Sequence, residues 1–202
     1  MTNSRNTVLA GGLGLGAVLV AGALLGDRVP PLDAWVADHL YAESGFWADA
    51  AVAVSGAGTI LAVVAVLAAA VALWWRERSA VLVARCAAVL AACLGTLVLQ
   101  TVFQRSGPPV TEQDWTYPSG HVVVMTALGF TAVMIARRLP PLWRGVVVPG
   151  AAVMIALVGA SRVVLGEHYL VDVVAALVAT AGVGLLASAV FRTRPDDSVR
   201  TT

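Results

Sequence analysis

The chain has 202 residues, of which 59% are hydrophobic and 12% charged, and its net charge is +1. Soluble domains are about 45–50% apolar and about 25% charged, so this composition excludes an ordinary soluble domain. The near-neutral charge offers no basic surface for a nucleic acid. The mean hydropathy of +0.85 favours an integral membrane protein, and the chain has room for six helices of about 20 residues.

Six hydrophobic segments follow one another, and each is long enough, or nearly so, to cross the hydrocarbon core as a helix. They predict an all-α integral membrane bundle of six transmembrane helices, forming a single membrane domain over residues 1–202. The predicted spans are residues 8–26, 50–75, 80–103, 121–136, 145–164 and 169–191. Residues 192–202 form a short polar tail. Cys86 and Cys93 lie seven apart in one span, about 10 Å along a helix axis, which is too far for a disulfide.

The first span allows a second interpretation. Arg5, an apolar run and the sequence Ala21-Gly22-Ala23 have the pattern of a cleaved signal peptide. The run is long for a signal peptide, so we favour an uncleaved first helix. Cleavage would leave the topology of the remaining chain unchanged.

Between the first two spans, the segment Leu32–Trp47 carries apolar residues at helical spacing. This pattern predicts a short amphipathic helix that lies on the outer surface of the membrane. Two roles are open for it: part of an entrance for a lipid, or a packed connection.

The arginines orient the predicted bundle. Three lie on one side of the membrane, and nine lie on the other, namely Arg5, Arg76, Arg78, Arg137, Arg138, Arg144, Arg192, Arg194 and Arg200. The positive-inside rule places the nine-arginine side and both termini in the cytoplasm. Lysine is absent and alanine and valine are abundant, which is typical of a GC-rich bacterial genome. We therefore expect a multi-pass protein of a bacterial plasma membrane.

A first polar cluster, Tyr117-Pro118-Ser119-Gly120-His121, opens the fourth span on the outer side. Proline and serine suit a helix start, where free backbone N–H groups and the helix dipole favour an anion. Ser119 adds a hydroxyl donor, Gly120 allows a phosphate to approach the backbone, and His121 can carry a proton. An ordinary helix start with an interfacial histidine is the alternative.

A second polar cluster lies between the fifth and sixth spans, also on the outer side. Ser161 and Arg162 end one span, and His168 and Asp172 begin the next at a spacing of four residues, on one helical face. A carboxylate beside an imidazole fixes its tautomer, and an arginine offers planar donors to phosphate oxygens. The alternative is a salt bridge from Arg162 to Asp172 or Glu167.

Both clusters fall on the side that the arginine count makes the outer one. Two histidines, a carboxylate, an arginine and a helix start can transfer a phosphoryl group, one histidine attacking phosphorus and the other protonating the leaving group. His168 and Asp172 offer two metal ligands at most, whereas a closed zinc site takes four. We therefore expect neither a metal nor a cofactor.

These residues resemble the motifs of the type 2 phosphatidic acid phosphatase family, the membrane relatives of vanadium haloperoxidases. The family's P-S-G-H motif matches Pro118–His121, and its S-R-x5-H-x3-D motif matches Ser161, Arg162, His168 and Asp172. The resemblance implies that His168 is the nucleophile, that Asp172 orients it and that His121 is the general acid. It also implies that Arg162, Ser119 and the Gly120 backbone hold the phosphate.

The family's first motif, K-x6-R-P, is degenerate. Aligned on Pro108, its lysine position is Gln100 and its arginine position is Gly107. Arg105 lies two residues before Gly107, so we list it with Gln100 and Ser161 as a candidate substrate-binding residue. A charge-assisted hydrogen bond contributes about 1.5–3 kcal/mol, so two missing cations favour an altered substrate or reaction.

The sequence thus predicts a metal-independent phosphatase that acts on a membrane lipid phosphate or diphosphate at the outer face. The resemblance suggests a polyprenyl diphosphate, phosphatidylglycerophosphate, phosphatidate or a related lipid as substrate. Two alternatives stay open: a lipid phosphotransferase with the same histidine pair, and a non-catalytic protein that binds lipid phosphates. The sequence does not indicate an oligomeric state.

Overall fold

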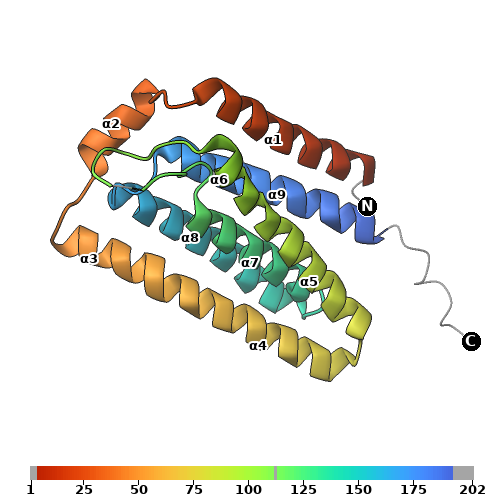
Figure 1. The fold of residues 1–202 in the computed structure, drawn as a ribbon. Helices are drawn as coiled ribbons and strands as arrows, with labels where there is room; N and C mark the ends of the chain where they lie inside the picture. The colour runs from red at the N-terminus through yellow and green to blue at the C-terminus, as the bar shows by residue number, and fades with distance from the viewer. Residues whose placement is uncertain (1–3, 112, 193–202) are drawn as a thin grey trace, which may run out of the picture.

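The computed structural model describes residues 4–111 and 113–192. Of the tail predicted over residues 192–202, residue 192 is the last of a helix, and residues 193–202 lie outside the described range. Helices run side by side through the described chain (Figure 1). In chain order the elements are α1 (Ser4–Leu25), α2 (Pro31–Leu40), α3 (Phe46–Ala53), the π-helical turn η1 (Val54–Gly58), α4 (Thr59–Glu77), α5 (Ala80–Leu94), the 3₁₀ turn η2 (Gly95–Leu97), α6 (Val98–Phe103), α7 (Gly120–Ala136), α8 (Pro141–Val164) and α9 (Leu170–Arg192).

The predicted helical membrane bundle is confirmed. Elements α3, η1 and α4 join into one long helix, as do α5, η2 and α6. Five helices of the described chain are long and apolar enough to cross a membrane, namely Arg5–Leu25, Phe46–Glu77, Ala80–Phe103, Pro141–Val164 and Leu170–Phe191. With the shorter α7 they correspond one to one with the six predicted spans.

The short helix α7 lies inside the bundle, where it packs against α4, α5, α8 and α9. Its 17 residues extend for about 25 Å at 1.5 Å per residue, somewhat less than the hydrocarbon thickness. Val122, Val123 and Ala127 are fully buried, as expected for a helix that is apolar on every side. The start of α7 is therefore enclosed by its neighbours. Cys86 and Cys93 are buried free thiols, as predicted.

The predicted surface helix exists, but its predicted end at residue 47 is wrong. Helix α2 ends at Leu40, whereas Phe46 and Trp47 begin the long helix that continues into α4. Gly45 has a φ of +86°, a left-handed conformation that glycine adopts readily and that separates the two helices. The buried side of α2 carries Asp33 and Val36.

The two ends of the bundle carry different loops (Figure 1). At one end, Nη2 of Arg76 in the last turn of α4 donates to the Arg138 carbonyl after α7 at 2.7 Å, which joins α4 to the loop after α7 on the arginine-rich side. Helix α2, the loop segments 104–111 and 113–119 and the turn of residues 165–169 gather at the other end (Figure 1). The separation of the two sides agrees with the predicted topology, and the direction in which they face across the membrane stays a prediction.

Candidate active site

The start of α7 presents unpaired polar groups inside the protein. Ser119 is fully buried, and its Oγ has no hydrogen-bond partner among the described residues. The first helical hydrogen bond runs from Val123 N–H to the Ser119 carbonyl at 2.9 Å. The N–H groups of residues 120–122 therefore precede the helical ladder and are available to an anion.

Two contacts hold this helix start from opposite sides. The Ser119 N–H donates to the main-chain carbonyl of Asp172 at 3.1 Å, which ties α7 to α9. On the other side, Nε2 of Gln100 in α6 donates to the Pro118 carbonyl at 3.0 Å. A Cβ at Gly120 would lie 3.3 Å from the same Gln100 nitrogen. Gln100 thus supports the P-S-G-H segment through a main-chain contact.

The second polar cluster is folded by a tight turn between α8 and α9. The Arg162 carbonyl accepts from the N–H groups of Glu167 and His168, at 3.1 and 3.3 Å. Gly166 has a φ of +65°, and a Cβ there would approach the Tyr41 ring to 2.8 Å. Only glycine suits both the left-handed conformation and the close contact with the Tyr41 ring. Gly166 therefore allows the tight turn between Arg162 and His168.

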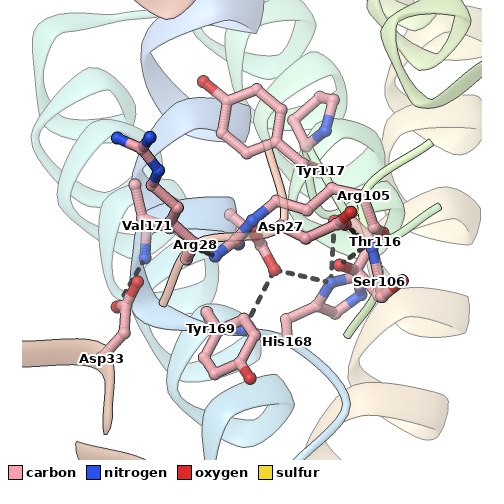
Figure 2. Close-up of polar contacts among 12 residues, drawn as sticks. Asp27, Arg28, Asp33, Arg105, Ser106, Thr116, Tyr117, His168, Tyr169 and Val171 are labelled. Carbon is pink, nitrogen blue, oxygen red and sulfur yellow. Dashed lines mark hydrogen bonds and ion pairs between the residues drawn. The ribbon is translucent and has the colours of Figure 1, made fainter. Parts of the chain in front are cut away.

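His168 is buried and has a defined tautomer. Its Nδ1 lies 3.0 Å from the Thr116 carbonyl (Figure 2). A carbonyl only accepts hydrogen bonds, so Nδ1 carries a proton, and in the neutral ring Nε2 has the lone pair. The family resemblance implies that Asp172 makes this orienting contact. In the structure Asp172 Oδ2 lies 3.9 Å from Nδ1, within ion-pair range but beyond a hydrogen bond.

Asp172 is fully buried and belongs to a second set of contacts. Its Oδ1 accepts from Arg105 Nη1 at 2.5 Å, and its Oδ2 accepts from the Tyr169 N–H at 3.0 Å. The other Arg105 nitrogens, Nε and Nη2, donate to the carbonyls of Gly26 and Arg28 at 3.0 and 2.9 Å (Figure 2). All three nitrogens of Arg105 therefore have partners within the protein.

One of the three guanidinium nitrogens of Arg162 is available to a ligand. Its Nη1 donates to Ser55 Oγ at 2.8 Å, and its Nη2 forms an ion pair with Glu167. Its Nε is buried and has no partner in the described part of the chain. The side chains of Arg162 and His168 both lie near enough to His121 to act on its charge. The two predicted clusters therefore meet in one place.

The remaining predicted residue, Ser161, is engaged within its own helix. Its buried Oγ donates to the Val158 carbonyl at 2.7 Å. Gly107, the degenerate arginine position, lies where a Cβ would meet Thr116 Cγ2 at 2.7 Å and the Gln113 carbonyl at 3.1 Å. The loop thus packs so closely against Gly107 that it leaves no room for a side chain at this position.

Sequence reasoning missed two residues of this site. Ser55 lies within the predicted apolar span of residues 50–75, although a buried polar residue in a span is itself a signal of function. It lies in the π-helical turn η1, a type of distortion that often occurs at functional sites. Thr116 acts through its main-chain carbonyl, which no side-chain pattern reveals.

Metal ligands do not gather here. Within residues 4–111 and 113–192, no three His, Cys, Asp or Glu side chains lie close enough together to hold a metal ion. A cavity of about 360 Å³ lies between α4, α7 and α8, and its lining is apolar and includes none of the predicted site residues. The polar site and this cavity are separate features of the bundle.

Comparison with known proteins agrees with the geometry. The family model of the PAP2 superfamily matches residues 98–196, which include every predicted site residue. A solved structure titled as the first transmembrane PAP2 type phosphatidylglycerolphosphate phosphatase from Bacillus subtilis is similar, with a TM-score of 0.73 and 20% sequence identity. The similarity covers 96% of this chain and 99% of that chain, and at this identity it establishes the fold. No curated protein matches the sequence. Residues 98–196 thus form a PAP2 superfamily domain, and this domain holds both of the motifs that meet in the site.

Proposed function

We propose that this chain is a membrane-embedded phosphatase that hydrolyses a lipid phosphate or diphosphate through a phosphohistidine on His168, without a metal. One observation carries the proposal. Two buried donors without a partner in the described part of the chain, Arg162 Nε and Ser119 Oγ, accompany a helix start and a histidine whose Nε2 carries the lone pair in the neutral ring. Buried polar groups are almost always hydrogen-bonded, so an anion such as a phosphate group is the partner that these donors fit.

The first step transfers the phosphoryl group to the protein. Nε2 of His168 attacks phosphorus, and the P–O bond to the lipid alcohol, or to the terminal bridging oxygen of a diphosphate, breaks. His121 donates its proton to that leaving oxygen. Arg162, Ser119 and the N–H groups at the start of α7 stabilise the charge on the equatorial phosphoryl oxygens.

The second step releases phosphate. His121, now neutral, accepts a proton from a water molecule, whose oxygen attacks the phosphohistidine. The P–N bond breaks, inorganic phosphate leaves and His168 recovers its lone pair. The buried carboxylate of Asp172, 3.9 Å from Nδ1, stabilises the positive charge that the imidazole carries while it is phosphorylated.

The substrate class follows from the setting of the site. A headgroup at the end of a membrane bundle leaves its hydrocarbon tails in the bilayer, which suits a lipid. The similar solved structure is titled a phosphatidylglycerolphosphate phosphatase, so this lipid is the first probe. Polyprenyl diphosphate and phosphatidate complete the panel.

The decisive experiment measures phosphate release from this panel by the purified protein in detergent, with and without EDTA. We expect turnover that survives EDTA and is lost in His168→Ala. The matched control is His39→Ala, since His39 is an exposed histidine on α2 that contacts Trp35. Absence of release from every lipid would overturn the phosphatase proposal. The same reactions should then be searched for a phosphoryl group passed to an added alcohol, which would identify a transferase.

A second measurement tests the intermediate. Acid-labile, base-stable label from a ³²P-labelled lipid should appear on the wild-type protein after rapid quenching and be absent from His168→Ala. Turnover without such label at any time point would contradict a phosphohistidine.

We further propose that the site faces the outside of a bacterial plasma membrane and that both termini are cytoplasmic. The arginine-rich loops at the opposite end of the bundle support this orientation. A fluorescent reporter that folds only in the cytoplasm, fused to the C-terminus, should be bright. If the reporter is dark although the fusion protein is present in the membrane at its normal level, the C-terminus lies outside and the proposed orientation is wrong.

A further inference from the structure

Arg105 occupies an unusual position for a cation near a phosphate site. It is among the most deeply buried large side chains of the described chain, 2% exposed. Its guanidinium lies 4.8 Å from the centre of the Tyr169 ring, and its three nitrogens donate to Asp172, Gly26 and Arg28. These partners take three of the five guanidinium N–H groups and engage every nitrogen, so the buried Arg105 side chain is directed at protein atoms.

Two routes connect Arg105 to His168. Through the main chain, the Arg105 carbonyl accepts from both the N–H and the Oγ1 of Thr116, at 2.8 and 3.3 Å. The carbonyl of the same Thr116 residue then holds Nδ1 of His168. Through the side chain, Arg105 pairs with Asp172, whose other carboxylate oxygen lies 3.9 Å from that Nδ1.

We propose that Arg105 is a positioning residue that compensates the charge of Asp172, so that His168 stays neutral and nucleophilic, and that Arg105 does not bind the substrate phosphate. This inference rests on the proposed function for the role of His168. A fully buried carboxylate close to an imidazole favours the protonated imidazolium, which has no lone pair for attack. An arginine on the same carboxylate offsets this effect while it leaves Asp172 in place to stabilise the phosphorylated imidazole.

The other charges around His168 do not replace this pairing. Arg162 on α8 is paired with Glu167, and His121 on α7 lies on the phosphate side of the site. Asp33 on α2 accepts from the Val171 N–H and adds negative charge near Asp172 (Figure 2). The phenols of Tyr117 and Tyr169 are neutral, because burial raises the pKa of each. Arg105 is therefore the cation that acts directly on Asp172 in the described chain.

The test compares four variants. Arg105→Gln removes the charge, and Arg105→Lys keeps it but cannot make all three hydrogen bonds. The double variant Arg105→Gln/Asp172→Asn removes both charges together, which guards against the instability of an unpaired buried carboxylate. Arg144→Gln is the matched control, since Arg144 is exposed at the opposite end of the bundle.

The first readout does not depend on turnover. The protein, with ¹⁵N-labelled histidine and in detergent, has three histidines to resolve by NMR, and His168→Asn assigns the signal of interest. We expect the titration midpoint of His168 to lie about one pH unit or more higher in Arg105→Gln than in the wild type. In Arg105→Lys, Arg144→Gln and the double variant, it should stay near or below the wild-type midpoint.

The second readout is the pH profile of kcat/KM on the best lipid of the panel. In Arg105→Gln its acidic limb should move to higher pH in parallel with the NMR midpoint, while KM at high pH changes less than threefold. An unchanged midpoint in a folded Arg105→Gln protein would overturn the inference. So would a tenfold or larger rise in KM without a change in the acidic limb, since that result assigns Arg105 to the phosphate. A wild type that releases no phosphate would refute the proposed function, and the NMR comparison would still decide the role of Arg105.

Discussion

Ser55 and Arg162 share a buried hydrogen bond of 2.8 Å that joins the π-helical turn η1 to the end of α8. Ser55 is 4% exposed, and its own carbonyl accepts from the Thr59 Oγ1 at 2.6 Å. Ser55 thus contacts the guanidinium through its hydroxyl and Thr59 through its carbonyl. Together with the Glu167 ion pair, this bond holds Nη1 and Nη2 of Arg162, and Nε is buried without a partner in the described part of the chain. In the proposed mechanism this Nε donates to the phosphate.

Ser55→Ala should therefore weaken substrate binding. Hydrogen bonds to charged groups contribute about 1.5–3 kcal/mol, and about 1.4 kcal/mol corresponds to a tenfold change in affinity. We expect KM to rise by roughly tenfold, with a smaller change in kcat. Steady-state kinetics on the preferred lipid measure both constants.

Two variants control for this result. Ser55→Thr keeps the hydroxyl and should retain most of the affinity, and Ser44→Ala removes an exposed serine and should change nothing. A wild-type KM in Ser55→Ala would show that the Glu167 ion pair alone is enough to orient Arg162.

Gly107→Arg restores the arginine of the family's first motif in sequence but should not restore its function. A Cβ at residue 107 meets Thr116 Cγ2 at 2.7 Å and the Gln113 carbonyl at 3.1 Å, so the loop has to shift. Overpacking of this kind costs about 1–3 kcal/mol, and here it also displaces the carbonyl that holds His168. We expect a lower midpoint of thermal unfolding and a lower kcat, measured on the same preparation.

Ser106→Arg is the matched control for Gly107→Arg, because Ser106 is its exposed neighbour. Thr116→Ala in the Gly107→Arg background removes one of the two clashing groups and should recover part of the stability. Higher affinity together with wild-type stability in Gly107→Arg would contradict this account of the loop.

Asp33 should make the protein less stable at neutral pH than at mildly acidic pH. Desolvation by burial raises the pKa of this carboxyl above its ordinary value, against the lowering effect of the hydrogen bond from Val171. A folded-state pKa above the unfolded-state value means that the folded protein binds the proton more tightly. The stabilising contribution of the protonated group is present below pH 3.8 and is lost as the pH rises through the folded-state pKa.

Asp33→Asn removes this titration and keeps an acceptor for Val171 N–H. We expect the variant to exceed the wild type in unfolding midpoint at pH 7, with a difference that shrinks toward pH 4. Thermal unfolding in detergent over this pH range checks it, with the exposed Asp38→Asn as the control. A difference that is constant with pH would show that Asp33 is not the group responsible.

Tyr117 links the site to α1 through its hydroxyl, which donates to the Val18 carbonyl at 2.8 Å. Burial raises the pKa of this phenol to about 12, so it remains a donor at any pH near neutrality. Tyr117→Phe should lower the free energy of unfolding by about 1 kcal/mol and leave turnover nearly unchanged. Chemical denaturation at neutral pH measures the loss, with Tyr41→Phe as the control.

The sign of the pH dependence follows from the same bond. The stability that Tyr117 contributes is present below the ordinary phenol pKa of 10 and declines as the pH rises toward 12. The wild type should therefore lose stability over that range more steeply than Tyr117→Phe. Parallel declines would mean that other groups account for the alkaline destabilisation.

Much of this architecture is determined by the sequence alone. A helix that crosses hydrocarbon has to be continuous and apolar over a fixed length, so the spans, their number and the side that collects arginine follow from composition. Each of the two motifs, Pro118–His121 and Ser161–Asp172, can also be recognised from the sequence, since its residues lie close together in the chain. The prediction that they form one site follows from their position on the same side of the membrane. The predicted end of the surface helix is wrong because Phe46 and Trp47 continue its apolar periodicity, whereas the chain leaves the helix after Leu40 and turns at the left-handed Gly45.

The tertiary structure decided which atoms meet. Sequence spacing places Asp172 and His168 on one helical face. In the structure, however, the Asp172 carboxylate accepts hydrogen bonds from Arg105 and Tyr169. Nδ1 of His168 is hydrogen-bonded to the Thr116 carbonyl. Ser55 and Arg162 are separated by more than a hundred residues and meet only because α8 packs against η1. Such contacts depend on the packing angle of helices and on main-chain carbonyls. Neither can be predicted from the sequence of side chains, so the hydrogen-bond partner of each polar group is known only from the tertiary structure.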